Sequence, residues 1–300
     1  MVDVVSQEVI TAATFNGLQS RIETVLGQGF TDTGYGQSLS SSIVAANTVI
    51  TAQHLNNLKS DIDKCRAHQT GSLSPLETIG VTDQIGATES ISASGAISTS
   101  KGINDYLALL NNIEGDKQQC DDTQASVEAV LSSTRVSEWN GTIIHKFLIT
   151  FASIDARRHF FNAGGQLRIQ GQLTSGSSAK DSDWATMLSA MGTITIASHA
   201  TTQSGTGVPT AVGNFELTST SQRLFHKLGT AYDYSNNMFQ VNAKTIDSDK
   251  IEIEIQLQDN ADGGGDPNVT GTITSSITHR RPSGTYVSIP SPTYSNTTLL

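Results

Sequence analysis

The feature that most constrains this chain is a sequence that repeats at an offset of 40 residues near the N-terminus. Residues 9–22 read VITAATFNGLQSRI and residues 49–62 read VITAQHLNNLKSDI, which match at eight positions. A repeat of this kind encodes a small unit that cannot bury its apolar face alone and that needs a neighbouring copy to do so. The sequence therefore predicts two similar units that pack together.

Each copy has the pattern of an amphipathic helix that follows a capping residue. Thr11 and Thr51 stand at the expected N-cap positions, where a side-chain oxygen accepts a hydrogen bond from an early backbone N–H. The apolar residues behind them recur at helical spacing, namely Phe15, Leu18, Ile22 and Val25 in the first copy and Leu55, Leu58 and Ile62 in the second. The glycine-rich loop at 27–36 lies between the copies and lacks the spacing of a phosphate-binding loop.

Two further helices are expected, over residues 101–113 and, more briefly, over 123–131, because apolar residues again recur at helical spacing. After residue 139 the pattern changes to a period of two, which is typical of strands. The least ambiguous strand is IEIEIQLQ at 251–258. Other strands are expected at 142–151, 166–173, 193–198, 214–218, 238–244 and 269–278, with a helix inserted at 181–191.

These elements predict an α+β fold in two regions. Residues 1–135 form a mainly helical docking region that contains the internal repeat, and residues 136–300 form an antiparallel β-sandwich with a helical insertion.

Composition excludes several classes of protein. The net charge is −10, whereas general nucleic-acid binders need clustered Lys and Arg. We expect no membrane span, because the chain has no apolar run of about 18 residues, and its start lacks the pattern of a signal peptide. Charged residues make up 15% of the chain, below the roughly 25% of ordinary soluble domains. Such a surface is typical of a chain that neighbouring subunits cover.

Motifs of common enzymes are absent from the sequence. It contains no G-x-S-x-G, H-E-x-x-H or Walker A motif and no pair of C-x-x-C units. We therefore expect no catalytic residues, no cofactor and no metal. The acidic segment at 259–266 offers oxygen ligands for calcium, but it lacks the EF-hand spacing and is better interpreted as a hairpin loop. Cys65 and Cys120 are too few for a disulfide framework, and the sequence leaves open whether they pair.

The densest charged cluster is DARRHFFNAGG at 155–165. Its arginines and histidine could hold an anion or assist acid–base chemistry. The preferred interpretation is structural: an apolar plug, a tight glycine reversal after it, and arginines that bond carbonyl or carboxylate oxygens. The expected assembly residues are then Arg157, Arg158, His159, Phe160, Phe161, Gly164 and Gly165, together with the caps Thr11 and Thr51.

Three segments resemble a family of virion structural proteins of contractile-tailed marine phages, including those that infect cyanobacteria. They are GYGQ at 34–37, STRVSEWNG at 133–141 and RRHFFNAGGQLR at 157–168, of which FFNAGG is the most specific. The resemblance extends over nearly the whole chain, to PSPTYSNTT at 290–298. It implies membership of the phage particle but no position within it, and it carries no catalytic residues over to this chain.

The expected function is that of a non-enzymatic component of the tail, neck or fibre-attachment apparatus, assembled in the host cytoplasm. Its partners would be other virion proteins and copies of itself, with no nucleic acid and no membrane. One alternative is a host-binding adhesin that recognises surface glycan through exposed Trp or Tyr beside Asp or Asn. A second is a hydrolase of envelope polymer, which would need two carboxylates about 5–9.5 Å apart in a cleft.

Overall fold

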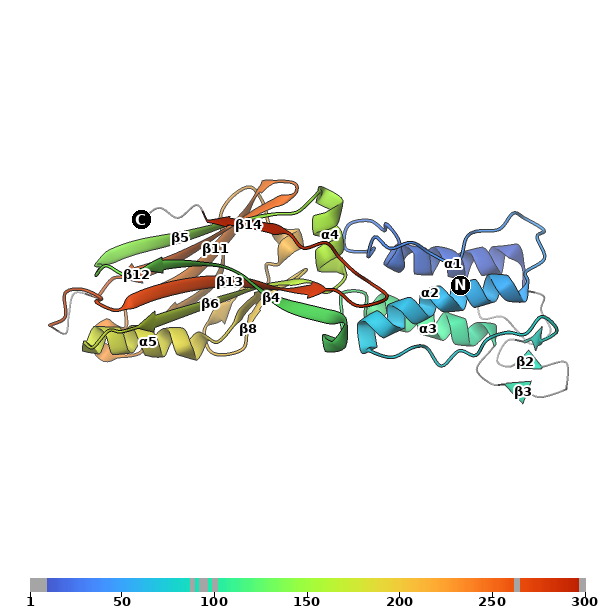
Figure 1. The fold of residues 1–300 in the computed structure, drawn as a ribbon, viewed down its shortest axis with the longest axis horizontal. Helices are drawn as coiled ribbons and strands as arrows, with labels where there is room; N and C mark the ends of the chain where they lie inside the picture. The colour runs from blue at the N-terminus through green and yellow to red at the C-terminus, as the bar shows by residue number, and fades with distance from the viewer. Residues whose placement is uncertain (1–9, 87–89, 92–96, 99–101, 262–264, 297–300) are drawn as a thin grey trace. The chain divides into compact units, whose positions relative to one another are not determined.

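The computed structural model describes residues 10–86, 90–91, 97–98, 102–261 and 265–296. It has mixed α and β structure, in agreement with the α+β prediction (Figure 1). The chain divides into two compact units. The first consists of Met1–Ser126, Arg158–Gly164 and Pro282–Ile289, and the second of Val127–Arg157, Gly165–Arg281 and Pro290–Leu300. Two segments from the C-terminal half of the sequence thus belong to the first unit.

Three helices form the core of the first unit: α1 (Ala12–Leu26), α2 (Ala52–Thr70) and α3 (Ile103–Gly115). They lie side by side, and each contacts the other two (Figure 1). The apolar positions that repeat along the sequence face this core and are buried. A small antiparallel sheet is formed by β1 (Gln84–Ile85), β2 (Ser90–Ile91) and β3 (Ile97–Ser98).

The helices of the two sequence copies begin in the same way. Thr11 is extended, and its Oγ1 accepts a hydrogen bond from the backbone N–H of Thr14 at 3.1 Å. Thr51 is also extended and accepts from the N–H of His54 at 3.4 Å, while the His54 ring accepts in return from the N–H of Thr51. The prediction that both threonines are N-caps is confirmed.

The asparagine that the two copies share makes the same contact in each. The Asn16 side chain donates to the carbonyl oxygen of Val44 at 2.9 Å and accepts from its N–H at 2.8 Å. Asn56 makes the same two bonds to Ile79, both at 2.9 Å. In each copy the returning chain is therefore held to its helix by one amide group that satisfies both a donor and an acceptor of the backbone.

Two antiparallel sheets make up most of the second unit. The six-stranded sheet has the order β14-β5-β12-β11-β10-β9 and consists of β5 (Gly141–Thr150), β9 (Val208–Pro209), β10 (Gln222–Leu228), β11 (Met238–Asp247), β12 (Lys250–Asp259) and β14 (Thr293–Asn296). The five-stranded sheet has the order β4-β13-β6-β7-β8 and consists of β4 (Ala125–Arg135), β6 (Gln166–Thr174), β7 (Ile194–Ile196), β8 (Thr201–Gln203) and β13 (Thr272–Pro282).

Each sheet has one buried face. In β12 the isoleucines and Leu257 are buried and alternate with half-buried polar residues, as the sequence pattern predicts. Between β6 and β7 the chain forms α5 (Ala179–Met191). A Cβ atom at Gly171 of β6 would lie 2.9 Å from Leu188 of α5 and 3.2 Å from Phe239 of β11. Glycine at this position allows a close approach between β6 and its neighbours in the core.

Two local predictions are wrong. The helix expected at 123–131 is instead part of β4, which pairs with β13. A helix of this length is marginal by itself, whereas the neighbouring strand supplies partners for every second backbone group. The strand expected at 214–218 is a short 3-10 helix, Asn214–Glu216. The charged cluster at 155–165 lies between β5 and β6 and contains a helix that the sequence did not predict, α4 (Ile154–Asn162).

We expect the shared asparagine contact to stabilise the first unit. Asn56→Ala leaves the N–H and carbonyl of Ile79 without the bonds described above, so the free energy of unfolding should fall by about 1–3 kcal/mol. Urea unfolding followed by circular dichroism measures this change. Gln53→Ala, at an exposed position on the same helix, should change the free energy by no more than about 0.5 kcal/mol. Equal losses in the two variants would contradict the assignment.

Candidate functional site

Helix α4 positions the charged cluster that the sequence singles out. The helix begins after Ser153, whose Oγ accepts from the N–H of Ala156 at 3.0 Å. It ends at Asn162, and Gly164 two residues later has a φ of 83°. This left-handed conformation favours glycine and lets the chain reverse into β6. Gly165, buried, leads directly into that strand.

The polar side chains of α4 bind the glycine-rich loop at 27–36. Arg158 donates to the carbonyl oxygens of Thr33 at 2.8 Å and Gln28 at 2.7 Å. Asn162 also donates to the Thr33 carbonyl, at 2.6 Å. The His159 ring lies 3.2 Å from the Gln28 carbonyl oxygen. Five N–H donors on a rigid guanidinium suit this task, because one side chain can satisfy several carbonyls at once.

The contact between the glycine-rich loop and α4 requires glycine at position 36. Gly36 has a φ of 68°, and a Cβ atom there would lie 2.3 Å from Nδ1 of His159. The loop therefore approaches α4 more closely than a side chain would allow. Two sequence motifs more than a hundred residues apart, the glycine-rich loop and the charged cluster, are parts of one structure, which no local pattern reveals.

Phe160 and Phe161 are both fully buried, and their rings meet edge to face with centroids 5.0 Å apart. The prediction that they are buried is confirmed.

The described bonds of Arg157 go to Asn214 Oδ1 at 2.7 Å, to the Asn214 carbonyl and to the Ser248 carbonyl. Burial lowers the pKa of Arg157 to about 10, and nearby Asp249 acts in the opposite direction.

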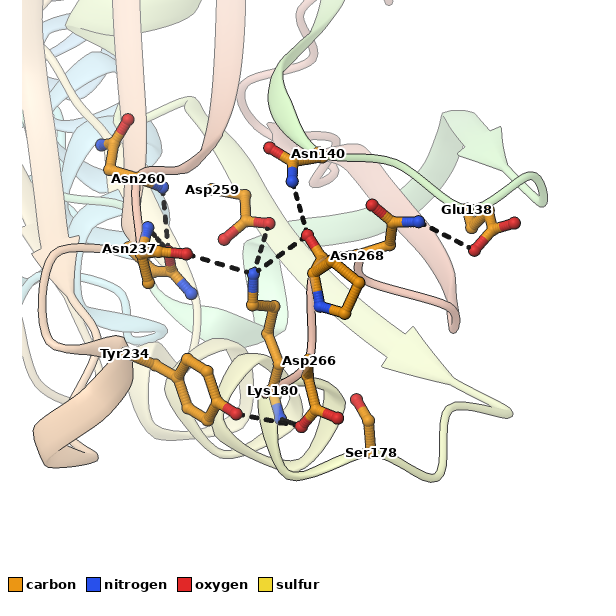
Figure 2. Close-up of polar contacts among 12 residues, drawn as sticks. Glu138, Asn140, Ser178, Lys180, Tyr234, Asn237, Asp259, Asn260, Asp266 and Asn268 are labelled. Atoms are coloured by element: carbon orange, nitrogen blue, oxygen red, sulfur yellow. Dashed lines mark hydrogen bonds and ion pairs between the residues drawn. The ribbon is translucent and has the colours of Figure 1, made fainter. Parts of the chain in front are cut away.

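A second polar cluster surrounds the first turn of α5, and the sequence does not single it out as a site. Figure 2 shows Lys180 and Asp259 pointing toward one another, with 2.9 Å between Nζ and Oδ2. Both side chains are almost completely buried. The Lys180 ammonium also donates to the carbonyls of Ala261 at 3.3 Å and Pro267 at 3.4 Å, so its three N–H bonds have three acceptors.

The acidic segment at 259–266 follows β12 and precedes β13, which belong to different sheets, so the interpretation as a hairpin loop is wrong. The first carboxylate of the segment, that of Asp259, binds the ammonium of Lys180. Asp266 accepts from the hydroxyl of Tyr234 at 2.9 Å and from the backbone N–H of Lys180 at 3.3 Å (Figure 2). Within the ranges that the structure describes, no group of three His, Cys, Asp or Glu side chains is arranged to hold a metal ion.

Two more carboxylates of the same turn bind backbone groups of other loops. Asp181 accepts from the N–H and hydroxyl of Thr270, at 2.8 and 2.6 Å, and from those of Ser178 in a capping box. Burial by itself would raise the pKa of Asp181, but these hydrogen bonds outweigh it and hold the pKa well below its usual value. Asp183 accepts from the N–H of Ala231 at 2.9 Å.

The chain matches no family model, no curated protein and no solved structure with which it was compared. Among the described residues, every helix is too short or too polar to cross a lipid bilayer.

The buried phenylalanines of α4 should contribute strongly to stability. Phe161→Ala removes a fully buried ring and should lower the free energy of unfolding by roughly 3–5 kcal/mol. Ile154→Ala, on the same helix at a position that is 57% exposed, should change it by no more than about 0.5 kcal/mol. Denaturant unfolding of both variants tests this, and a loss below about 1 kcal/mol for Phe161→Ala would refute the plug.

The Asp181 carboxylate should make stability depend on pH. Its pKa is lower in the folded than in the unfolded chain, so its contribution is complete above the unfolded value of about 4 and is lost as the pH falls below it. Asp181→Asn should therefore cost more stability at pH 7 than at pH 3. Urea unfolding at the two values measures the difference, with Asp233→Asn at an exposed position as the control. A cost for Asp181→Asn that does not change with pH would contradict this assignment.

Proposed function

We propose that the protein is a non-enzymatic structural component of a contractile-tailed phage particle, in the tail, neck or fibre-attachment apparatus. The observation that carries the proposal is the contact between two of the segments on which the family resemblance rests, GYGQ at 34–37 and RRHFFNAGG at 157–165. Gly36 of the first lies against His159 of the second, and the other donors of the second segment bind loop carbonyls. These side chains maintain the fold, which supports a structural role for them over an anion site or a catalytic one.

We also propose that the sequence repeat is a structural repeat. Both copies share the threonine cap and the two-way asparagine contact. In both, the returning chain then makes a hydrogen-bonded turn, at 45–48 and at 80–83. For the second unit we propose a β-sandwich with α5 as its helical insertion. The single buried face of each sheet and the close approach at Gly171 support this arrangement.

The docking surface that we propose lies in the N-terminal helical region. Large apolar side chains are exposed there, namely Phe30, Ile43, Val49, Leu73 and Val81. Val49 is 79% exposed and Val81 is 95% exposed. Both line a surface depression of about 970 Å³ beside the caps Thr11 and Thr51. Burying such side chains against another copy of the chain or another virion protein would contribute about 1.5–3 kcal/mol each.

One observation favours a second candidate, a tail adhesin that binds host surface glycan. Tyr232 is 95% exposed and lies beside the exposed Asp233 in a short 3-10 turn of the second unit. An aromatic face next to a carboxylate is suited to stacking on a sugar ring while hydrogen bonding its hydroxyl groups. Tyr232→Ala should abolish binding to host-envelope glycan if this candidate is correct and should leave particle assembly unchanged.

Association in solution tests the proposed docking surface. The wild-type protein should form an oligomer or a complex with another virion protein that buries more than roughly 1,000 Å², and Val49→Ser with Val81→Ser should weaken it at least tenfold. Val208→Ser with Leu228→Ser, at exposed apolar positions of the second unit, is the matched control. Analytical ultracentrifugation measures the dissociation constants.

The location of the chain in a particle map tests the wider proposal. The proposal would be refuted if the protein is absent from purified particles and forms neither an oligomer nor a complex with any virion protein. Depolymerisation of envelope glycan that Asp155→Asn abolishes would instead establish a hydrolase.

A further inference from the structure

A cysteine and a histidine of the first unit form a pair that the structural proposal does not use. The Sγ atom of Cys120 lies 3.9 Å from Nδ1 of His68, in the last turn of α2, and 3.5 Å from the carbonyl oxygen of Asp121, which is a second acceptor for its thiol. The backbone also holds the two together, because the N–H of Asp121 donates to the carbonyl of His68 at 2.9 Å. A backbone hydrogen bond therefore holds His68 and Cys120 near one another, in addition to the contact between their side chains.

The surroundings of His68 determine which ring nitrogen faces the thiol as an acceptor. Nε2 lies 2.9 Å from the carbonyl oxygen of Ala163, which can only accept, so Nε2 carries the hydrogen. In the neutral ring the lone pair of Nδ1 then faces Cys120. The Tyr35 ring and the imidazole pack in a T-shaped arrangement, with centroids 5.0 Å apart. His68 is therefore fully buried and oriented as a base toward Sγ.

The two cysteines of the chain differ sharply in their environment. Cys65 lies on α2 one turn before His68 and is fully buried, and burial raises the pKa of its thiol well above the usual range. Cys120 is partly exposed. A Cβ atom at Gly164 would lie 2.8 Å from the Cβ of Cys120, so glycine at this position of the FFNAGG segment leaves room for the cysteine. Cys65 is therefore closed to solvent, whereas part of Cys120 is accessible.

We propose that Cys120 and His68 form a thiol-modification site that reacts with small-molecule disulfides of the glutathione class. Sγ attacks one sulfur of the disulfide while the thiol proton passes to Nδ1 of His68. A new S–S bond forms, the S–S bond of the reagent breaks, and its second sulfur leaves as a thiolate that takes up the proton. Cys120 is oxidised and the leaving sulfur is reduced.

The rate of mixed-disulfide formation in the folded protein tests this site. Wild-type protein and Cys65→Ser should react at the same rate with oxidised glutathione, and with an aromatic disulfide that releases a coloured thiolate. Cys120→Ser should form no adduct. His68→Gln keeps an amide N–H for the Ala163 carbonyl but lacks the base, and it should react about a hundredfold more slowly. Peptide mass spectrometry locates the adduct.

Two controls separate loss of the base from loss of the fold. Cys65 should remain unlabelled in His68→Gln, which shows that the helical core is intact. The wild-type protein unfolded in urea, where His68 no longer faces Cys120, should also react at Cys120 more slowly than the folded protein. An unchanged rate in His68→Gln, an adduct on Cys65, or faster reaction of Cys120 in the unfolded chain would each overturn the proposal.

Discussion

The binding of loop carbonyls by Arg158 and Asn162 is the interaction on which the rest of the first unit depends. The glycine-rich loop turns its carbonyl oxygens toward α4, and at the part-buried Thr33 and buried Gly34 bonds a carbonyl without a partner would be costly. The guanidinium and the amide supply donors to Gln28 and Thr33 and thereby attach a C-terminal segment of sequence to the N-terminal helices. Without these two side chains the loop would need another source of donors, and the close approach at Gly36 would bring no benefit.

Polar side chains also satisfy the hydrogen bonds of irregular backbone in other parts of the molecule. Asn16 and Asn56 satisfy the backbone of the segments that return along their helices. In the second unit, Asp181 and Lys180 satisfy the N–H and carbonyl groups of loops around α5. A chain with only 15% charged residues therefore places several of its charges inside, where they organise irregular backbone.

Helices and strands could be predicted from the sequence where the residues that specify them lie close together in the chain. The caps at Thr11 and Thr51 and the helices behind them follow from residues within one turn of each other, and the alternation at 251–258 specifies both a strand and its buried face. The segment 123–131 could not be predicted in this way. Its spacing suits a short helix as well as a strand, and the pairing with β13, about 150 residues away, decides between them.

The sequence by itself determined the two helices that follow Thr11 and Thr51, the class of the fold and the burial of Phe160 and Phe161. Only the tertiary structure decided the partners: Gln28 and Thr33 for Arg158, Asp259 for Lys180, and His68 for Cys120. Propensity and capping act between residues close in sequence, whereas a buried polar group is satisfied by whichever donor or acceptor the fold brings to it, and sequence separation carries no information about that.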